Sequence, residues 1–321
     1  MSETSNKKEE KITKNCLRCG GNLEFSPKHQ AIFCCQCGTI YDIEKNKNIT
    51  KHNLQDVKDI KLEDKLFADN NNVFNCPNCG SKLVLNKLEY TKKCPYCGSV
   101  QIKKTRINPG VSPDSIIPFK FDEEVAAEKF KQAMKKKVFA PNAFKKKPIS
   151  DNIYGIFIPT FAYDADSQTS YSGTEKIEHV HIDSNNIRRV SYSYRNFSGK
   201  FNMNHRNVLV EDSPSLNQLD LESIKPYNYN EMYKYNDDFI RGYTVEYHEH
   251  PIATCTDIAH TIMKNDINSS IKRKEGGNIV SLRTNTNFEC EKFTYFLLPA
   301  YKVEYKYKDK DVWEIKIGGN N

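Results

Sequence analysis

Two cysteine quartets of identical spacing constrain this chain more than any other feature of its sequence. Each quartet is a pair of Cys-x-x-Cys-Gly turns separated by 14 residues, and the second quartet follows the first at an offset of 60 residues. Two thiolates three positions apart can bind one ion, and two such turns complete a tetrahedral four-thiolate zinc shell. The glycine after each turn supplies the left-handed backbone that the chain needs to fold back. The spacing therefore predicts two structural zinc ribbons, each holding one Zn²⁺, with the ligands Cys16, Cys19, Cys34, Cys37, Cys76, Cys79, Cys94 and Cys97.

The cellular compartment bears on whether these cysteines bind metal. The charged first residues contain no apolar segment of a secretory signal, and the longest apolar stretch, residues 153–163, is too short to span a membrane. We therefore expect a cytoplasmic protein without a transmembrane segment, which would reach a membrane only through a partner. In a reducing compartment such cysteines bind metal more often than they form disulfides. Disulfides and an iron-sulfur centre are the alternatives, and Cys35 is expected to be a spare thiol.

The formal net charge of +7 is a weak argument for nucleic-acid binding. Residues 1–110 contain 19 Lys or Arg against 12 Asp or Glu, and the remainder contains 29 of each. A zinc tetrathiolate carries a charge of about −2, so two of them would reduce the excess in the ribbon half to about +3.

Composition and periodicity divide the chain into five parts. We expect a flexible leader (1–14), a first zinc ribbon (15–44), a linker (45–73), a second zinc ribbon (74–110) and one larger domain (111–321). In that domain, strands are expected at 115–121, 153–163, 170–180, 279–287 and 291–306, among others, and the polar residues 183–186 suit a hairpin turn. Apolar residues follow helical spacing near residues 125–138 and 255–271, and Asp122 is the expected cap of the first helix. The predicted fold is α+β, with a mainly antiparallel sheet and two amphipathic helices.

Two segments of the larger domain resemble each other. Ile156–Phe161 reads Ile-Phe-Ile-Pro-Thr-Phe, and 140 residues later Phe296–Tyr301 reads Phe-Leu-Leu-Pro-Ala-Tyr. Each follows a predicted strand and helix, which suggests an internal duplication. Because proline cannot donate to a β-ladder, we expect Pro159 and Pro299 to mark an edge or a bulge.

Several motifs together resemble a known family. These are the second ribbon, the run Gly-Val-Ser-Pro-Asp-Ser-Ile-Ile-Pro-Phe at 110–119, Phe-Ala-Pro-Asn at 139–142, and Ile-Pro-Thr-Phe-Ala-Tyr-Asp-Ala-Asp at 158–166. As a set they resemble the bacterial TFIIB-type zinc-ribbon-containing proteins, a largely uncharacterised family often labelled similar to primosomal helicase. Some members continue into carboxy-terminal membrane helices and act in membrane-associated assemblies. The resemblance therefore implies an assembly role more than an activity.

The helicase label finds no support in the residues. The chain contains no GxxxxGK[ST] phosphate-binding loop, because Gly199-Lys200 is followed by Phe201. We therefore expect no nucleotide-driven motor.

Three other groups of residues are candidate sites. Lysine triplets at 135–137 and 145–147 either bind phosphates or are a helix terminus and a solvated loop. The pairs His179/His181 and His248/His250 could hold a metal if their strands were adjacent, and otherwise they are ordinary surface or satisfied histidines. Cys255 and Cys290 are expected to be packing residues and not nucleophiles.

A closed four-thiolate shell has no open coordination position, so the ribbons are expected to present surfaces and not to catalyse. The leading hypothesis is a non-enzymatic adaptor that binds protein partners through its ribbons and its α+β body. A nucleic-acid-binding ribbon protein is the alternative, and an enzyme with a histidine-bound metal is the third. The sequence does not determine the oligomeric state.

Overall fold

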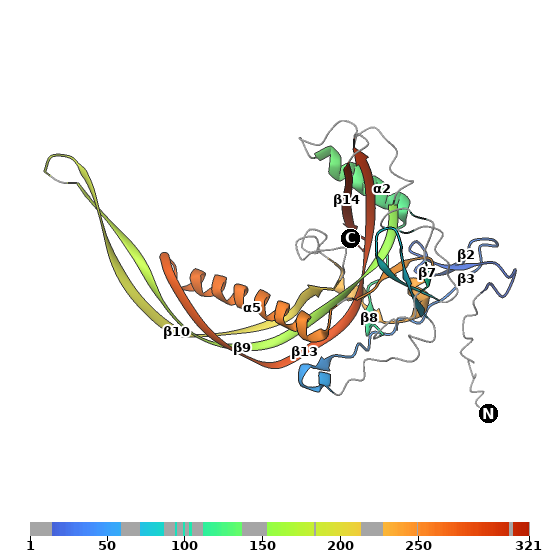
Figure 1. The fold of residues 1–321 in the computed structure, drawn as a ribbon, viewed down its shortest axis with the longest axis horizontal. Coiled ribbons are helices and arrows are strands. Elements are labelled where there is room, and N and C mark those ends of the chain that lie inside the picture. The colour runs from blue at the N-terminus through green and yellow to red at the C-terminus, as the bar shows by residue number, and fades with distance from the viewer. Residues whose placement is uncertain are drawn as a thin grey trace, which may run out of the picture.

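The fold is α+β, as predicted, with a mostly antiparallel sheet and, among the described residues, two α-helices and two amino-terminal cysteine clusters. It is seen in a computed structural model (Figure 1). That structure describes residues 15–58, 71–86, 94, 99, 103–104, 112–136, 153–182, 184–212, 227–248, 250–307 and 311–320.

A small sheet and a large sheet contain the described strands. The small sheet has the order β1 (Leu23–Ser26), β2 (Ala31–Cys34) and β3 (Ile40–Tyr41). The large sheet has 11 strands, with the main order β11-β8-β13-β9-β12-β6-β5-β7, while β10 pairs with β9, and β14 and β4 pair with β13. Its strands are β4 (His52–Asn53), β5 (Asn71–Asn75), β6 (Lys82–Asn86), β7 (Lys103–Lys104), β8 (Ser115–Ile116), β9 (Ile153–Ile182), β10 (Arg188–Glu211), β11 (Tyr233–Lys234), β12 (Thr244–Glu246), β13 (Asn278–Tyr307) and β14 (Asp311–Gly318).

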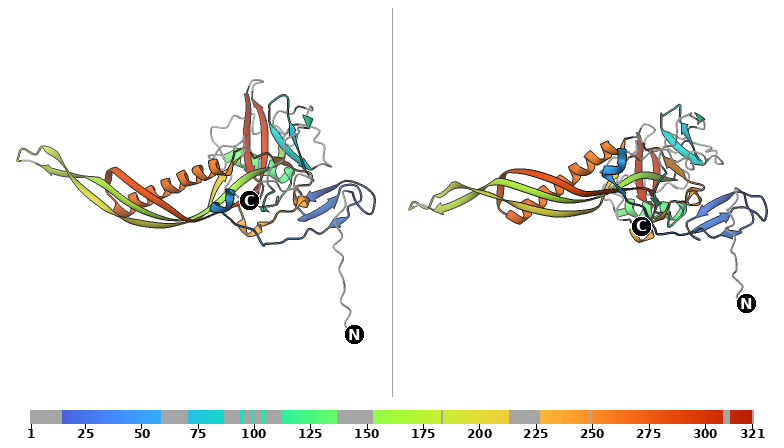
Figure 2. Two further views of the ribbon diagram at one scale, coloured as in Figure 1. Left: turned by 60° about the horizontal axis from the view of Figure 1, so that its bottom comes forward. Right: turned by 90° about the horizontal axis from the view of Figure 1, so that it is seen from below.

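Three very long strands form a curved arm that projects from the body (Figures 1 and 2). Strands β9 and β13 have 30 residues each and β10 has 24. The strands predicted separately at 153–163 and 170–180 are one strand, and so are those predicted at 279–287 and 291–306. Strands β9 and β10 are joined by the turn that we predicted near 183–186.

Helix α5 (Ile252–Glu275) lies along the inner side of this arm (Figure 1). Its buried residues recur every three or four positions, so one face of the helix is covered along its length. Ile267 and Ile271 pack with Tyr171 of β9 and with side chains of β10 and β13. The helix ends at Gly276, whose φ of 69° is readily available only to a residue without a Cβ.

Helix α2 (Glu123–Lys136) has the predicted amino-terminal cap. The Val125 amide donates to the Asp122 carboxylate at 3.1 Å, and Glu123 and Glu124 follow in the first turn. The helix buries Ala126 and Phe130 against the body. Short 3₁₀ helices are η1 (Leu54–Lys58), η3 (Tyr229–Glu231) and η4 (Asp237–Ile240).

The predicted edge or bulge at the two prolines is wrong. Pro159 and Pro299 lie within the regular central ladder, opposite Leu297 and Phe157. On its other side β9 pairs with β12 at Ile156–Phe157 and with β10 from Thr160 onward, so Pro159 falls where the neighbouring strand changes. A missing N–H costs little at such a junction because no ladder bond is required there.

The second proline occupies an equivalent junction. Pro299 lies between Phe296–Leu297, which pair with β8, and Ala300, where pairing with β14 begins. The carbonyl oxygens of Pro159 and Pro299 accept from the Asp212 and Gly319 amides, at 3.1 and 2.8 Å. The two matched segments are thus central, antiparallel and similarly surrounded, while their origin by duplication stays a prediction.

The predicted strand over 115–121 contains only two strand residues, β8 (Ser115–Ile116). After Pro118 the chain turns into the core, where the Phe119 ring centroid lies 4.9, 4.2 and 4.8 Å from those of Phe157, Tyr243 and Tyr301. Phe119 is fully buried and its carbonyl accepts from the Gln30 side chain at 2.7 Å. This residue therefore connects the small sheet to the core of the large one.

We expect Phe119→Ala to lower the free energy of unfolding by about 3–5 kcal/mol, because it leaves a cavity among three aromatic rings. Val125→Ala, at an exposed position of α2, is the control and should change it by less than about 1 kcal/mol. Urea unfolding followed by far-ultraviolet circular dichroism measures both variants. Equal midpoints for the two would show that this aromatic cluster does not limit stability.

Candidate metal centres

The first cysteine cluster brings together all four predicted ligands. One sulfur atom each from Cys16, Cys19, Cys34 and Cys37 lies within 4.8 Å of all the others. The Sγ atoms of Cys16 and Cys37, and those of Cys19 and Cys34, are 3.5 Å apart. Zinc–sulfur bonds of about 2.3 Å in a tetrahedron separate the sulfurs by about 3.8 Å, so the four residues fit one ion of this kind.

Local backbone geometry explains why the sequence forms this cluster. The Gly20 and Gly38 amides donate to the Cys16 and Cys34 carbonyls at 2.8 and 2.9 Å, closing the same turn twice. Both glycines have positive φ angles, of 74° and 73°. Strand β2 ends at Cys34, so the ladder with β1 and β3 places the second turn beside the first.

Tyr41 is a ligand neighbour that the sequence did not reveal. Its hydroxyl lies 3.2 Å from Cys16 Sγ and accepts from the Leu17 amide at 3.1 Å. The hydrogen bond between Tyr41 and Cys16 lowers the pKa of the Cys16 thiol to about 6, which favours the thiolate form that binds metal. Cys35 is exposed and lies outside the four-sulfur group.

The second cluster is described in part. Cys76, Cys79 and Cys94 have sulfur atoms within 4.8 Å of one another, and the Cys79 and Cys94 sulfurs are 3.7 Å apart. The Gly80 amide donates to the Cys76 carbonyl at 2.8 Å with a φ of 77° at the glycine, which repeats the turn of the first cluster. Cys97, the predicted fourth ligand, lies outside the described residues.

The two histidine pairs that could have held a metal on adjacent strands do not meet. His179 and His181 lie near the tip of the arm, where His179 Nε2 is 2.7 Å from Ser193 Oγ. His248 and His250 follow β12, beside Asp212 and the start of α5. Asp212 directly follows the last residue of β10, which pairs with Thr160 of β9. About 20 residues of β9 separate Thr160 from His179, a distance on the order of 60 Å along the strand.

His248 and His250 contact a buried carboxylate that sequence analysis missed. His250 Nδ1 and the His250 amide lie 2.6 and 3.0 Å from Asp212 Oδ1, and His248 Nδ1 lies 3.8 Å from Oδ2. Burial raises the pKa of Asp212 and lowers the pKa of His248, whose ring stacks on Tyr247. Burial disfavours the charged form of each group, which explains both directions.

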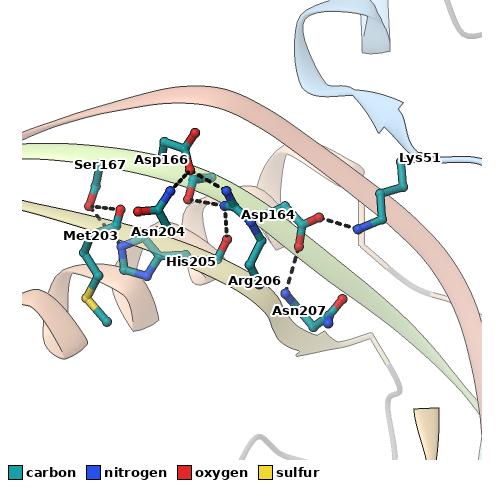
Figure 3. Close-up of polar contacts among 10 residues, drawn as sticks. Lys51, Asp164, Asp166, Ser167, Met203, Asn204, His205, Arg206 and Asn207 are labelled. Atoms are coloured by element: carbon teal, nitrogen blue, oxygen red, sulfur yellow. Dashed lines mark hydrogen bonds and ion pairs between the residues drawn. The ribbon is translucent and has the colours of Figure 1, made fainter. Parts of the chain in front are cut away.

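A second polar group lies where both outer strands of the arm bulge (Figure 3). The register with β9 shifts between His205 and Val208 on β10, and between Glu289 and Lys292 on β13. Asn207 and Cys290, one in each bulge, both have φ near 52°. Bulges bend a strand and increase its twist, so we expect both outer strands to bend at this position.

Hydrogen bonds and ion pairs hold the β10 bulge in place (Figure 3). Arg206 donates to the Asp166 carboxylate at 2.7 Å, which lowers the pKa of Asp166, and also to the His205 carbonyl at 2.7 Å. The Asp164 carboxylate accepts from the Asn207 amide at 2.8 Å and pairs with Lys51. These contacts form two separate groups, around Asp164 and around Asp166, and both stabilise the β10 bulge. The run Asn-His-Arg-Asn at 204–207, which breaks the alternation of β10, was the signal available in the sequence.

The remaining predicted sites carry less information. The side chains of the two lysine triplets, and all of residues 137–150, lie outside the described part. Cys255 is buried in α5, as expected of a packing residue, whereas Cys290 is exposed in the β13 bulge. Among the described residues, no helix is both long and apolar enough to cross a bilayer.

Comparison with known proteins gives little functional information. No family model matches the chain, and no solved structure matches it. An uncharacterised protein of Bacillus subtilis strain 168, YdjG, is 23% identical over 301 residues, which is 92% of this chain and 84% of YdjG. The similarity to YdjG extends beyond the cysteine-rich half. The resemblance to TFIIB-type zinc-ribbon proteins stays an interpretation of the sequence.

The metal clusters predict different outcomes for two adjacent cysteines. We expect Cys34→Ser to lose one bound metal ion per chain, because it removes a ligand from the first cluster. Cys35→Ser is the matched control and should keep the wild-type content, since its thiol lies outside the cluster. Inductively coupled plasma mass spectrometry of protein purified without added metal measures the content. Equal metal loss in both variants would contradict this assignment.

The lowered pKa of His248 predicts a pH dependence of stability. Below about pH 6.5, His248 binds a proton in the unfolded chain but not in the folded protein, where burial lowers its pKa. This residue therefore lowers the stability of the folded state as the pH falls. We expect the Tm of His248→Gln to fall less than that of the wild type between pH 7.5 and 5.5. His181→Gln, at the exposed arm tip, should behave as the wild type. Thermal unfolding measured over this pH range tests the prediction. Parallel curves of Tm against pH for all three proteins would contradict it.

Proposed function

We propose that this chain is a non-enzymatic zinc-binding adaptor, in which two structural metal centres present surfaces that bind protein partners. The observation that carries the proposal is the four-sulfur group of the first cluster. Four thiolates at tetrahedral separation suit Zn²⁺ and leave no coordination position for a substrate or an activated water. A second zinc would be held by Cys76, Cys79 and Cys94, with Cys97 as the fourth ligand.

The surface around the first centre supports a binding role. Leu17, inside the first Cys-x-x-Cys turn, is 62% exposed, and Ile40 of β3 is 47% exposed. Metal bonds and the Tyr41 hydrogen bond would hold the turn rigid, so an exposed leucine there loses little further conformational freedom on binding. Rigid apolar side chains of this kind are suited to anchor a protein partner.

The first cysteine cluster is attached to the body of the protein, which supports a role as an adaptor more than that of a flexibly tethered zinc finger. The Phe25 ring lies 5.6 Å from Phe239, and the Phe25 amide donates to the Arg241 carbonyl at 3.1 Å. The metal centre is thus held at one end of the molecule, with the arm extending from the body (Figure 2). Partners bound at the two ends would be held at a fixed separation. The family resemblance suggests that such partners belong to a membrane-associated assembly.

We expect Leu17→Asp to retain two zinc ions per chain and to lose partner binding, because it changes the exposed surface and no ligand. Val125→Asp, at another exposed apolar position, should retain both. Cross-linking and affinity capture from cells that express the chain naturally, with metal content measured on the same samples, separate these outcomes.

Two results would contradict the adaptor proposal. One is that the wild type and Leu17→Asp capture the same proteins to the same extent. The other is that the wild type captures nucleic acid with an affinity that falls steeply with salt, which would favour the nucleic-acid-binding alternative. A metal other than zinc would overturn the metal assignment alone.

A further inference from the structure

The end of the arm is a two-stranded ribbon without further support in the described structure. Strand β13 begins at Asn278, opposite Lys176, and α5 ends at Glu275. Beyond that point β9 and β10 continue for six more ladder pairs, from Ile177–Ser193 to Ile182–Arg188. All views show this ribbon extending past the helix and the third strand (Figures 1 and 2). A two-stranded ribbon alone is only marginally stable in water, so a contact with another molecule would stabilise it.

Exposed apolar side chains are concentrated on this ribbon. Of the 12 large hydrophobic side chains that are exposed in the described part of the chain, five lie on this ribbon or its turn: Val180, Ile182, Ile187, Val190 and Tyr192. Two more, Tyr194 and Val280, lie next to it where the third strand begins. Their exposed fractions run from 41% for Val190 to 67% for Ile182. Single exposed apolar residues are normal, but a contiguous group marks an interaction surface.

The ladder register places most of them on one face. Successive side chains alternate between faces, so the cross-strand pairs Ile182–Arg188, Val180–Val190, Glu178–Tyr192 and Lys176–Tyr194 share a face. The intervening pairs, which include His179–Ser191, share the other face, and that face continues into the surface covered by α5. We call the first set the apolar band.

The order of residues along the apolar band is self-complementary. The Val180–Val190 pair is at its centre, with Ile182 and Arg188 toward the tip and Glu178 and Tyr192 toward the body. A two-fold axis through the central pair and across the strands places Arg188 of one copy over Tyr192 of the other and beside its Glu178, and Ile182 over Glu178. Lys176 Nζ of the same chain already lies 3.6 Å from the Tyr192 ring centroid, so the new contact of Arg188 is with the Glu178 carboxylate. The same contact would form twice, as an isologous interface requires.

The charges of the band are available for such a contact. Within one chain the nearest Arg188 and Glu178 atoms are 3.7 Å apart, and the two side chains are 69% and 50% exposed. An exposed pair of this length contributes little, so both groups can be shared with a second molecule. Because charges of both signs flank an apolar centre, the band matches neither a lipid surface nor a phosphate backbone as well as it matches itself.

We propose that the apolar band is a homodimer interface, in which two copies of this chain pack the ends of their arms face to face about the Val180–Val190 pair. The interface is distant from the cysteine clusters and does not depend on metal. A dimer of this kind would place the two bodies at opposite ends of a pair of joined arms.

Charge exchange tests the interface between chains. In Glu178→Arg and in Arg188→Glu, like charges would face each other across the axis, and we expect each variant alone to be monomeric. Mixed together, the two variants restore opposite charges at both contacts and should form a heterodimer. An effect within one chain cannot produce this rescue, because each chain still carries its own like-charged pair. Sedimentation velocity of the full-length proteins, with one variant carrying a fluorescent label, measures the mixture.

Val190→Asp adds a charge at the centre of the band, and we expect it to raise the dimer dissociation constant by about tenfold or more. Ser191→Asp is the matched control on the opposite face of the same strand and should dimerise as the wild type. Circular dichroism confirms that each variant is folded.

Three outcomes would overturn the proposal. The first is that the wild-type protein remains monomeric at the highest concentration that can be prepared. Single charge variants that dimerise like the wild type are the second. The third is a monomeric wild type whose binding to anionic vesicles or duplex DNA is abolished by Val190→Asp, which would assign the band to that ligand.

Discussion

The antiparallel ladder between β9 and β13 is the interaction on which the rest of this structure depends. It runs from Lys176–Asn278 at the arm to Ile153–Val303 in the body, interrupted only by two register shifts. In the body, β8, β12 and β14 attach to its two strands, and in the arm β10 and α5 complete it. One continuous pair of strands therefore forms the centre of the body and the length of the arm.

A ladder of this length is only marginally stable without further contacts, and the contacts of α5 and of the β10 bulge stabilise it. A long ribbon needs a packed face, and α5 supplies one through Ile267 and Ile271 on Tyr171 and its neighbours. In the β10 bulge, Arg206 donates to the His205 carbonyl and the Asp164 carboxylate accepts from the Asn207 amide, so these backbone groups have side-chain partners. Beyond α5 no described element takes over, and there the exposed apolar residues begin.

The cysteine clusters depend on local geometry instead. Each of the three Cys-x-x-Cys-Gly turns that the structure describes closes through a hydrogen bond within a few residues, so spacing alone identified the four sulfurs of the first cluster and three of the second. The histidines show the limit of that reasoning. His179 and His248 occur in similar His-x-His motifs, yet they lie at opposite ends of β9 because nothing in their own sequence determines which strands are neighbours.

The sequence by itself determined the cysteine clusters, the α+β class, the α2 cap at Asp122 and the hairpin between β9 and β10. All of these depend on residues near one another in the chain or on a regular period. Only the tertiary structure decided that Pro159 and Pro299 lie in a central ladder, that Asp212 contacts His248 and His250, and that Val180 and Val190 are exposed. Whether a proline is tolerated in a strand, a carboxylate is buried or a valine is exposed depends on which distant strand or helix lies beside that residue. Those neighbours are fixed by the pairing and packing of the whole chain, which no local pattern records.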